Sequence, residues 1–205
     1  MNTIYHFGDS YGYTENKEPH FVELLSHRIG YEYNCNNSIL PGGSNEMILH
    51  RLLQKLFEFK PNDILFFNFS YFVRGCFYDK NDNEIKSTNR FYVDGMDENG
   101  KILTNEKHMF DIITHLLDYS EDYNRRLFHQ FNIIFEQLES RGVKIFYIYN
   151  ENTEWSDQLL KCGKHIKFDV GFNRWLVDNG YNKHQCCHYT KGVQGQILDH
   201  IMPNI

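Results

Sequence analysis

Hydrophobic and polar residues alternate along the chain in blocks that predict strands and helices in turn. Residues 3–7 are a short run of β-forming side chains. Residues 21–29 carry apolar side chains at helical spacing, between Pro19, which predicts the start of a helix, and Gly30, which predicts its end. Residues 31–36 predict a second strand, so the chain opens as strand, helix, strand.

The next block predicts a helix and a buried strand. Ser44 or Asn45 can cap a helix whose apolar residues run from Met47 to Leu56. After Pro61 and Asn62, residues 63–69 form an almost unbroken apolar run. Such a run is typical of a central parallel strand that is covered on both faces.

The remaining blocks predict an insertion and then more alternation. Turn signals between short alternating stretches predict an insertion, a hairpin or a lid, at about residues 76–107. The patterns after it predict a long helical region at 109–141, a strand at 143–149, and helices at 170–178 and 192–202. We therefore expect one domain over residues 1–205, a flavodoxin-like three-layer α/β/α sandwich around a mostly parallel sheet.

Composition and charge narrow the function classes. The chain has no alanine, which suggests an AT-rich genome, such as that of a phage, a virus or a low-GC bacterium. The net charge is -6, so we expect no nucleic-acid partner. The sequence shows no signal peptide and no apolar stretch of membrane-spanning length. We therefore expect no membrane partner and a cytoplasmic protein, virion-associated if it comes from a phage.

The cysteines and histidines near the end of the chain do not have the spacing of a metal site. The five cysteines are scattered, which is typical of free thiols in a reducing compartment. Cys186, Cys187 and His188 are adjacent, whereas paired zinc ligands are usually two or more residues apart. We expect no metal and no cofactor.

Residues with reactive or polar groups follow several predicted strands. Ser10, Gly43, Ser70 and Glu151 come after four of them, and the carboxyl ends of parallel strands share one edge of a sheet. A serine hydroxyl becomes a useful nucleophile when a base takes its proton and donors bind the oxyanion. In the segment Gly8-Asp9-Ser10, Gly8 would allow a tight turn, Asp9 would brace it, and Ser10 would present its hydroxyl.

These motifs resemble the SGNH/GDSL hydrolase family. Gly8-Asp9-Ser10 follows the first strand, Gly42-Gly43-Ser44-Asn45 follows the second, and His188 precedes Gly192 and a final amphipathic helix. The resemblance implies that Ser10 is the nucleophile and His188 the general base, with His6 and His184 as rivals. It also implies that the N–H groups of Ser10 and Gly43 bind the oxyanion, Gly42 being the alternative.

The chain departs from the family pattern at two places. The family carries a Gly-x-Asn-Asp block after the third strand, where this chain has Asn68-Phe69-Ser70. Asn45 is the best substitute for the missing oxyanion-hole asparagine, with Asn68 or Ser70 behind it, although Asn45 can equally serve as a helix cap.

Arg74 lies four residues after Ser70, and this spacing resembles a branch of the family found in phage and polysaccharide loci. Arg74 could contact substrate together with Ser70, or it could form a structural ion pair. The family's triad acid is replaced by Gln185. Either Ser10 and His188 act as a dyad, or Asp178 or Glu151 supplies the acid.

The resemblance implies a serine esterase that forms an acyl-enzyme. A small acyl group, acetyl above all, on a carbohydrate is the expected substrate, by analogy with the family. Two alternatives remain: a catalytically degenerate domain that serves as a phage structural or binding module, and a lipid or thioester acyl-hydrolase.

Overall fold

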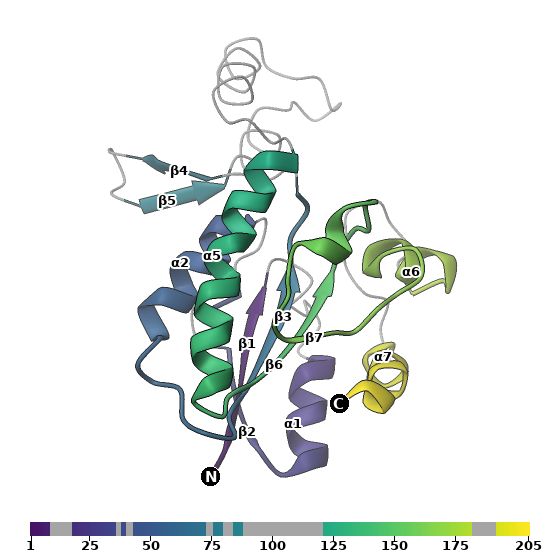
Figure 1. Ribbon diagram of the computed structural model, residues 1–205. Coiled ribbons are helices and arrows are strands. Elements are labelled where there is room, and N and C mark those ends of the chain that lie inside the picture. Colours follow the sequence, from purple (N-terminus) through teal and green to yellow (C-terminus); the bar gives the residue numbers. More distant parts are fainter. Residues whose placement is uncertain are drawn as a thin grey trace.

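The fold places a parallel sheet between two layers of helices (Figure 1). The computed structural model describes residues 1–8, 18–35, 38–39, 43–72, 76–79, 84–87, 121–181 and 192–205. The strands are β1 (Thr3–Gly8), β2 (Glu32–Asn34), β3 (Ile64–Phe69), β4 (Cys76–Asp79), β5 (Glu84–Ser87), β6 (Lys144–Tyr149) and β7 (Lys164–His165). The α-helices are α1 (Phe21–Ile29), α2 (Asn45–Lys55), α5 (Glu121–Ser140), α6 (Phe172–Asp178) and α7 (Gln194–Ile201), with short 3₁₀ turns at Ser156–Gln158 and Met202–Asn204.

The main sheet has the strand order β2-β1-β3-β6-β7, and each of its neighbouring pairs is parallel. The predicted α/β class is therefore confirmed. Strand β3 lies in the middle of the sheet and all six of its residues are buried, as its unbroken apolar run indicates. Strand β7 was not expected, because two residues are too short to show a periodic pattern.

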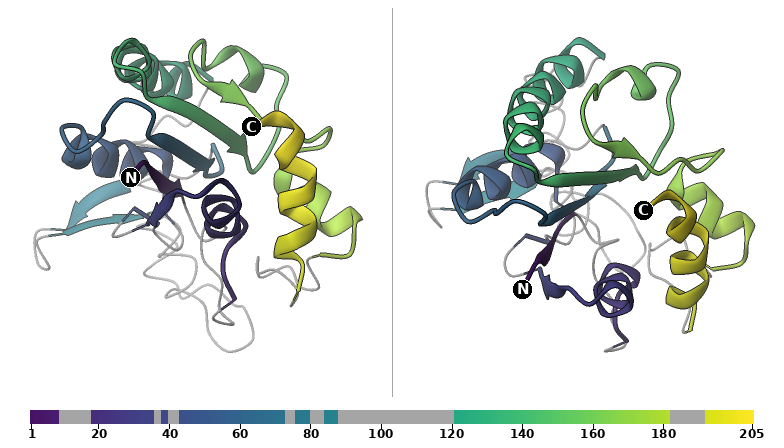
Figure 2. Two further views of the ribbon diagram at one scale, coloured as in Figure 1. Left: turned by 90° about the horizontal axis from the view of Figure 1, so that it is seen from below. Right: turned by 60° about the horizontal axis from the view of Figure 1, so that its bottom comes forward.

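Each face of the sheet has its own apolar core, and Figure 2 shows the helices on both sides. One core joins alternate residues of β1, β3 and β6 to α2 and α5, with Phe67, Phe131 and Phe135 at its centre. The other core joins the intervening strand residues to α1, α6 and α7. Successive strand residues point to opposite faces, so both cores come from the same strands.

The element boundaries follow the expected breakers. Gly30 ends α1 with φ 72°, and Asn62 adopts φ 72° before β3. Ser44, rather than Asn45, caps α2: its hydroxyl accepts a hydrogen bond from the Met47 N–H at 3.4 Å. The predicted insertion begins with an antiparallel hairpin, β4–β5. Residues 88–120 lie outside the described part of the chain, so the lid and the extent of the insertion stay predictions, as does the single-domain organisation.

Gly171 allows the chain to pass close to the end of β6. It has φ 81° and ψ 150°, a region that side chains disfavour. A Cβ at this position would lie 2.9 Å from the backbone nitrogen of Asn152 and 3.0 Å from Cα of Glu151. We expect Gly171→Ala to lower the free energy of unfolding by about 3 kcal/mol, through backbone strain together with the clash. Urea unfolding followed by tryptophan fluorescence measures this loss.

Gly180→Ala is the matched control. Gly180 also has a positive φ, 71°, but no atom lies within 4 Å of the added Cβ. Its substitution should lower the free energy of unfolding by about 1 kcal/mol. Equal losses for the two variants would contradict the close approach at Gly171.

Candidate active site

The carboxyl edge of the sheet between β1 and β3 is the natural place for a site. The connection from β1 to β2 contains α1, and the connection from β2 to β3 contains α2. Strands β2 and β3 lie on opposite sides of β1 in the sheet, and α1 and α2 cover opposite faces of it. In sheets of this kind, ligands bind in the crevice where the strand order reverses. Gly8, the last residue of β1, is paired there with Asn68 of β3. Asp9 and Ser10 come next along the chain and lie outside the described residues.

Three of the predicted site residues meet at this edge. The Ser70 hydroxyl donates a hydrogen bond to the Gly43 carbonyl at 2.7 Å. The Ser70 N–H donates to Oδ1 of Asn45 at 2.7 Å, and Nδ2 of Asn45 donates to the Ser70 carbonyl at 3.2 Å. Ser70 and Asn45 are both almost fully buried. The side chain of Asn45 therefore fastens the start of α2 to the loop after β3.

The structure separates the two candidate acids. Glu151 follows β6 and its carboxylate accepts a 2.6 Å hydrogen bond from the Phe72 N–H, so it braces the loop after β3. Asp178 lies at the end of α6, half-exposed, and forms an ion pair with Arg174 at 2.9 Å. Glu151 thus shares the carboxyl edge with Ser70 and Gly43, while Asp178 is engaged within its own helix. Arg74 lies outside the described residues.

A buried polar group lies beneath the edge. Nδ1 of His6 is 3.0 Å from the Tyr33 hydroxyl, and Nε2 of His6 is 3.4 Å from Oδ1 of Asn68. Burial and the neighbouring His20, whose ring centroid is 4.6 Å away, hold the pKa of His6 well below its usual range. His6 is therefore neutral at neutral pH. Its sequence position inside a strand predicts packing, and the structure shows packing together with hydrogen bonding.

Ser38, which the sequence did not indicate as a site residue, joins the end of β1 to the segment after β2. The Ser38 hydroxyl donates to the His6 carbonyl at 2.5 Å, and the Gly8 N–H donates to the Ser38 carbonyl at 3.1 Å. These bonds fix the backbone immediately before Asp9 and Ser10, which lie outside the described residues. No periodic signal marks Ser38, since it lies in an irregular segment.

The two segments that carry Ser10 and His188 have their described ends fastened to each other. Glu18 is the first described residue after Ser10, and Gly192 is the first after His188. The Gly192 N–H donates to the Glu18 carboxylate at 3.0 Å. One turn further on, the Phe21 N–H donates to Oε1 of Gln194 at 2.9 Å. The beginnings of α1 and α7 are therefore held side by side.

The surroundings of a second histidine, His165, make it a weak base. Burial lowers its pKa to about 4, although Asp157 lies 3.2 Å from Nδ1 and acts in the opposite direction. Its ring stacks on Tyr147 with centroids 4.9 Å apart. At neutral pH the neutral ring of His165 in β7 donates a hydrogen bond to the carboxylate of Asp157 in the 3₁₀ turn Ser156–Gln158.

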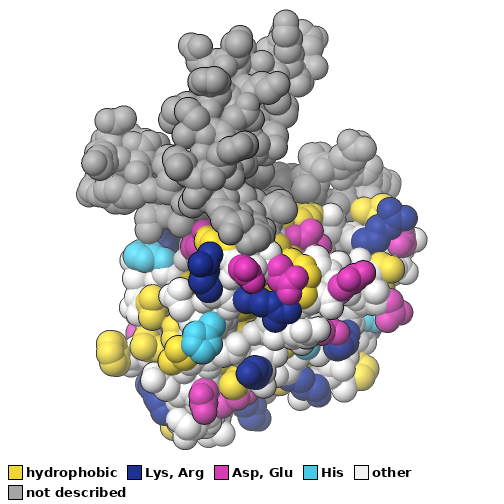
Figure 3. Space-filling model, turned by 45° about the horizontal axis from the view of Figure 1, so that its top comes forward, with side chains coloured by type: hydrophobic (Ala, Val, Ile, Leu, Met, Phe, Trp, Pro, Cys, Tyr) yellow, Lys and Arg dark blue, Asp and Glu magenta, His cyan; other side chains and the backbone are white. Residues whose placement is uncertain are grey.

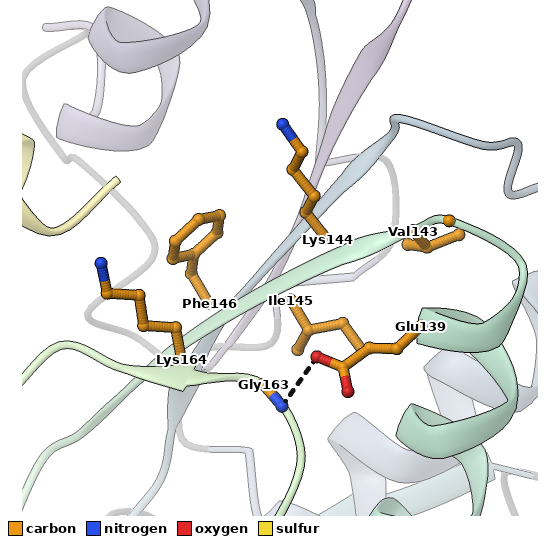
Figure 4. Close-up of a pocket in the computed structure, with 8 residues that line it drawn as sticks. Glu139, Val143, Lys144, Ile145, Phe146, Gly163 and Lys164 are labelled. Atoms are coloured by element: carbon orange, nitrogen blue, oxygen red, sulfur yellow. Dashed lines mark hydrogen bonds between the residues drawn. The ribbon is translucent and has the colours of Figure 1, made fainter.

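An open hollow of about 460 Å³ lies away from this edge (Figure 4). It is lined by the turn before β6, the first half of β6 and the start of β7, and Glu139 accepts a 3.0 Å hydrogen bond from the Gly163 N–H beside it. Since these are the amino ends of the strands, the hollow is separate from the candidate site.

The described surface shows mixed charge. In Figure 3, basic and acidic side chains are interspersed on the face that is turned forward, and the described part of that face has no continuous basic patch. Among the described helices, none is long and apolar enough to cross a membrane. Within the same residues, no cluster of three His, Cys, Asp or Glu side chains could hold a metal ion. Cys186, Cys187 and His188 lie outside them.

Comparison with known proteins identifies the fold. No family model matches the chain, and no curated protein matches it in sequence. Among solved structures, TesA superposes with a TM-score of 0.54 at 15% identity, over 99% of this chain and 97% of that one. A G-D-S-L family protein from Desulfitobacterium hafniense superposes with a TM-score of 0.50 at 11% identity, over the full length of both chains. Likeness at such identities establishes a shared fold.

Proposed function

We propose that this chain, whose fold is that of the SGNH/GDSL hydrolases, is a serine esterase with Ser10 as nucleophile and His188 as general base. The observation that carries the proposal is the pair of hydrogen bonds from Gly192 to Glu18 and from Phe21 to Gln194. His188 lies four positions before Gly192, a reach of at most about 14 Å. Because the ends of the two segments are fastened together, Ser10 and His188 can meet above the β1–β3 crevice.

The proposed reaction has two acyl transfers. His188 takes the proton of the Ser10 hydroxyl as Oγ attacks the ester carbonyl carbon, and the carbonyl oxygen becomes the oxyanion. The N–H groups of Ser10 and Gly43 and an asparagine amide would bind that oxyanion. The imidazolium then protonates the leaving alcohol oxygen, which leaves an acyl-enzyme. Water, deprotonated by His188, attacks the acyl carbon, and the acid departs as Ser10 regains its proton.

The anchoring of Gly43 supports its place in the oxyanion hole. Its carbonyl accepts the hydrogen bond from the buried Ser70 hydroxyl, which fixes the peptide that follows Gly43 and so restricts the backbone next to its N–H. Donors that are held before the reaction need no reorganisation as charge develops. The sequence predicts Asn45 as the side-chain donor, with Asp9 bracing the turn. It leaves open whether Ser10 and His188 act as a dyad or whether Asp178 or Glu151 supplies the acid, and of these two Glu151 lies at the carboxyl edge.

The substrate class we propose is a small acyl ester of a carbohydrate. This part of the proposal is supported by analogy with the SGNH/GDSL family. Asn45, Asn68 and Ser70 around the end of β3 are buried, so the groups that would contact the sugar lie elsewhere at this edge. A long acyl chain would need an apolar groove.

Hydrolysis of p-nitrophenyl esters of increasing acyl length tests this class. We expect kcat/KM to be highest for the acetate and to fall about 10-fold or more by the octanoate, because a long chain lacks an apolar surface to bury. Rising values with length would favour a lipid or thioester hydrolase. A folded protein without turnover on any ester would favour the binding module.

A further inference from the structure

The carboxyl end of β3 carries an amide donor with unusual surroundings. Asn68 is fully buried, and within the described part of the chain its Nδ2 has no hydrogen-bond partner. Buried polar groups are nearly always paired, because an unmet donor costs free energy, and a catalytic role is one of the reasons for an exception. Asn68 faces Gly8 across the β1–β3 pair, where a Cβ on Gly8 would lie 3.0 Å from Cβ of Asn68.

The orientation of this amide is set by two residues beneath it. The Asn68 Oδ1 atom can only accept a hydrogen bond, so the neutral His6 ring carries its proton on Nε2, 3.4 Å away. Nδ1 of His6 then accepts from the Tyr33 hydroxyl at 3.0 Å. Tyr33 thus donates to His6, and His6 donates to Asn68, so the chain of hydrogen bonds ends at the N–H₂ group of Asn68. The opposite orientation of the amide would need the other tautomer of His6, with its proton on Nδ1 toward the Tyr33 oxygen, so the tautomer of His6 shows which way the amide faces.

The other asparagine at this edge is already engaged. Asn45 uses Oδ1 and Nδ2 to bind the backbone of Ser70, so its amide is held toward the loop after β3. Of these two asparagines, Asn68 is the one whose Nδ2 has no hydrogen-bond partner among the described residues.

We infer that Asn68 is the side-chain donor of the oxyanion hole, and that His6 and Tyr33 are positioning residues that hold its amide toward the β1–β3 crevice. The inference rests on the proposed esterase function. Asn68 lies inside β3, two residues before Ser70. A donor at this position explains why the loop after β3 needs no oxyanion-hole asparagine.

Kinetics of four variants test the inference. Asn68→Leu keeps the volume and removes the donor, and we expect kcat for p-nitrophenyl acetate to fall about 10²- to 10³-fold, with KM within about 3-fold of the parent value. His6→Phe should lower kcat about 10-fold through misplacement of the amide. In the double variant the loss should equal that of Asn68→Leu alone, because both changes remove one function. Asn132→Leu removes two comparable bonds, to Leu159 and Lys161, and should leave kcat unchanged.

A measurement without turnover separates this inference from the proposed function. The ¹⁵N shifts of the His6 ring should show a neutral Nε2–H tautomer in the parent protein, and a mixture of tautomers in Tyr33→Phe. A parent protein without esterase turnover overturns the proposed function and the oxyanion role together. A neutral Nδ1–H tautomer, or an imidazolium at neutral pH, overturns the positioning by His6. An Asn68→Leu variant that keeps kcat within 3-fold overturns the role of Asn68.

Discussion

Replacing Ser10 with alanine should lower kcat for p-nitrophenyl acetate by at least about 10⁴-fold. The substitution removes the atom that forms the acyl-enzyme, so only binding and oxyanion stabilisation remain to accelerate attack by water. His188→Ala should cause a loss of similar size, because the hydroxyl of Ser10 then has no base. The double variant should be no slower than either single variant, since the two groups act as a unit. Initial rates over a range of substrate concentrations provide the measurement.

A serine and a histidine outside the proposed catalytic pair serve as controls for this prediction. Ser140→Ala changes an exposed serine at the end of α5, whose hydroxyl donates to the Gln137 carbonyl of the same helix. His184→Ala changes a histidine four residues from His188. Both should retain the parent rate. If His184→Ala lost activity and His188→Ala kept it, the assignment of the base would be wrong.

Replacing Asn45 with leucine should destabilise the fold more than a lost helix cap does. The leucine removes a donor to the Ser70 carbonyl and an acceptor for the Ser70 N–H in a fully buried position. Burying backbone groups without these partners costs about 1–3 kcal/mol each, so we expect the free energy of unfolding to fall by about 4 kcal/mol. Urea unfolding followed by the fluorescence of Trp155, which packs against Phe72 in the loop after β3, reports the change.

Ser44→Ala provides the comparison for Asn45. Ser44 is the observed cap of α2, and removal of such a cap costs about 1 kcal/mol. If the two variants lost similar amounts of stability, Asn45 would act as a cap and the connection to Ser70 would contribute little.

The sheet could be predicted from the sequence because its strands are long enough to show their patterns. Residues 63–69 indicate a central strand by their unbroken apolar run, and β3 is the middle strand of the sheet. Gly30 and Asn62 mark the ends of elements because each adopts a positive φ. Strand β7 could not be predicted, because two residues are too few to show a pattern and the strand is defined by its pairing with β6.

The site could be predicted only where a residue's neighbours in sequence define its role. The placement of Gly43, Ser70 and Glu151 after strands predicted their common edge, and hydrogen bonds join Gly43 to Ser70 and Glu151 to the Phe72 N–H beside it. The connections from Asn45 to Ser70 and from His6 to Asn68 cross 25 and 62 residues of sequence. Their partners depend on strand order and register, which no local pattern carries.

Covalent labelling tests the identity of the nucleophile most directly. The parent protein is incubated with a fluorophosphonate probe, digested, and analysed by mass spectrometry for the modified residue. A serine that is activated by a histidine base attacks the phosphorus, and fluoride leaves as the P–F bond breaks, which gives a stable adduct. We expect a single adduct on Ser10, which is lost in Ser10→Ala and forms much more slowly in His188→Ala. An unlabelled folded protein, or an adduct on another serine such as Ser70, would contradict it.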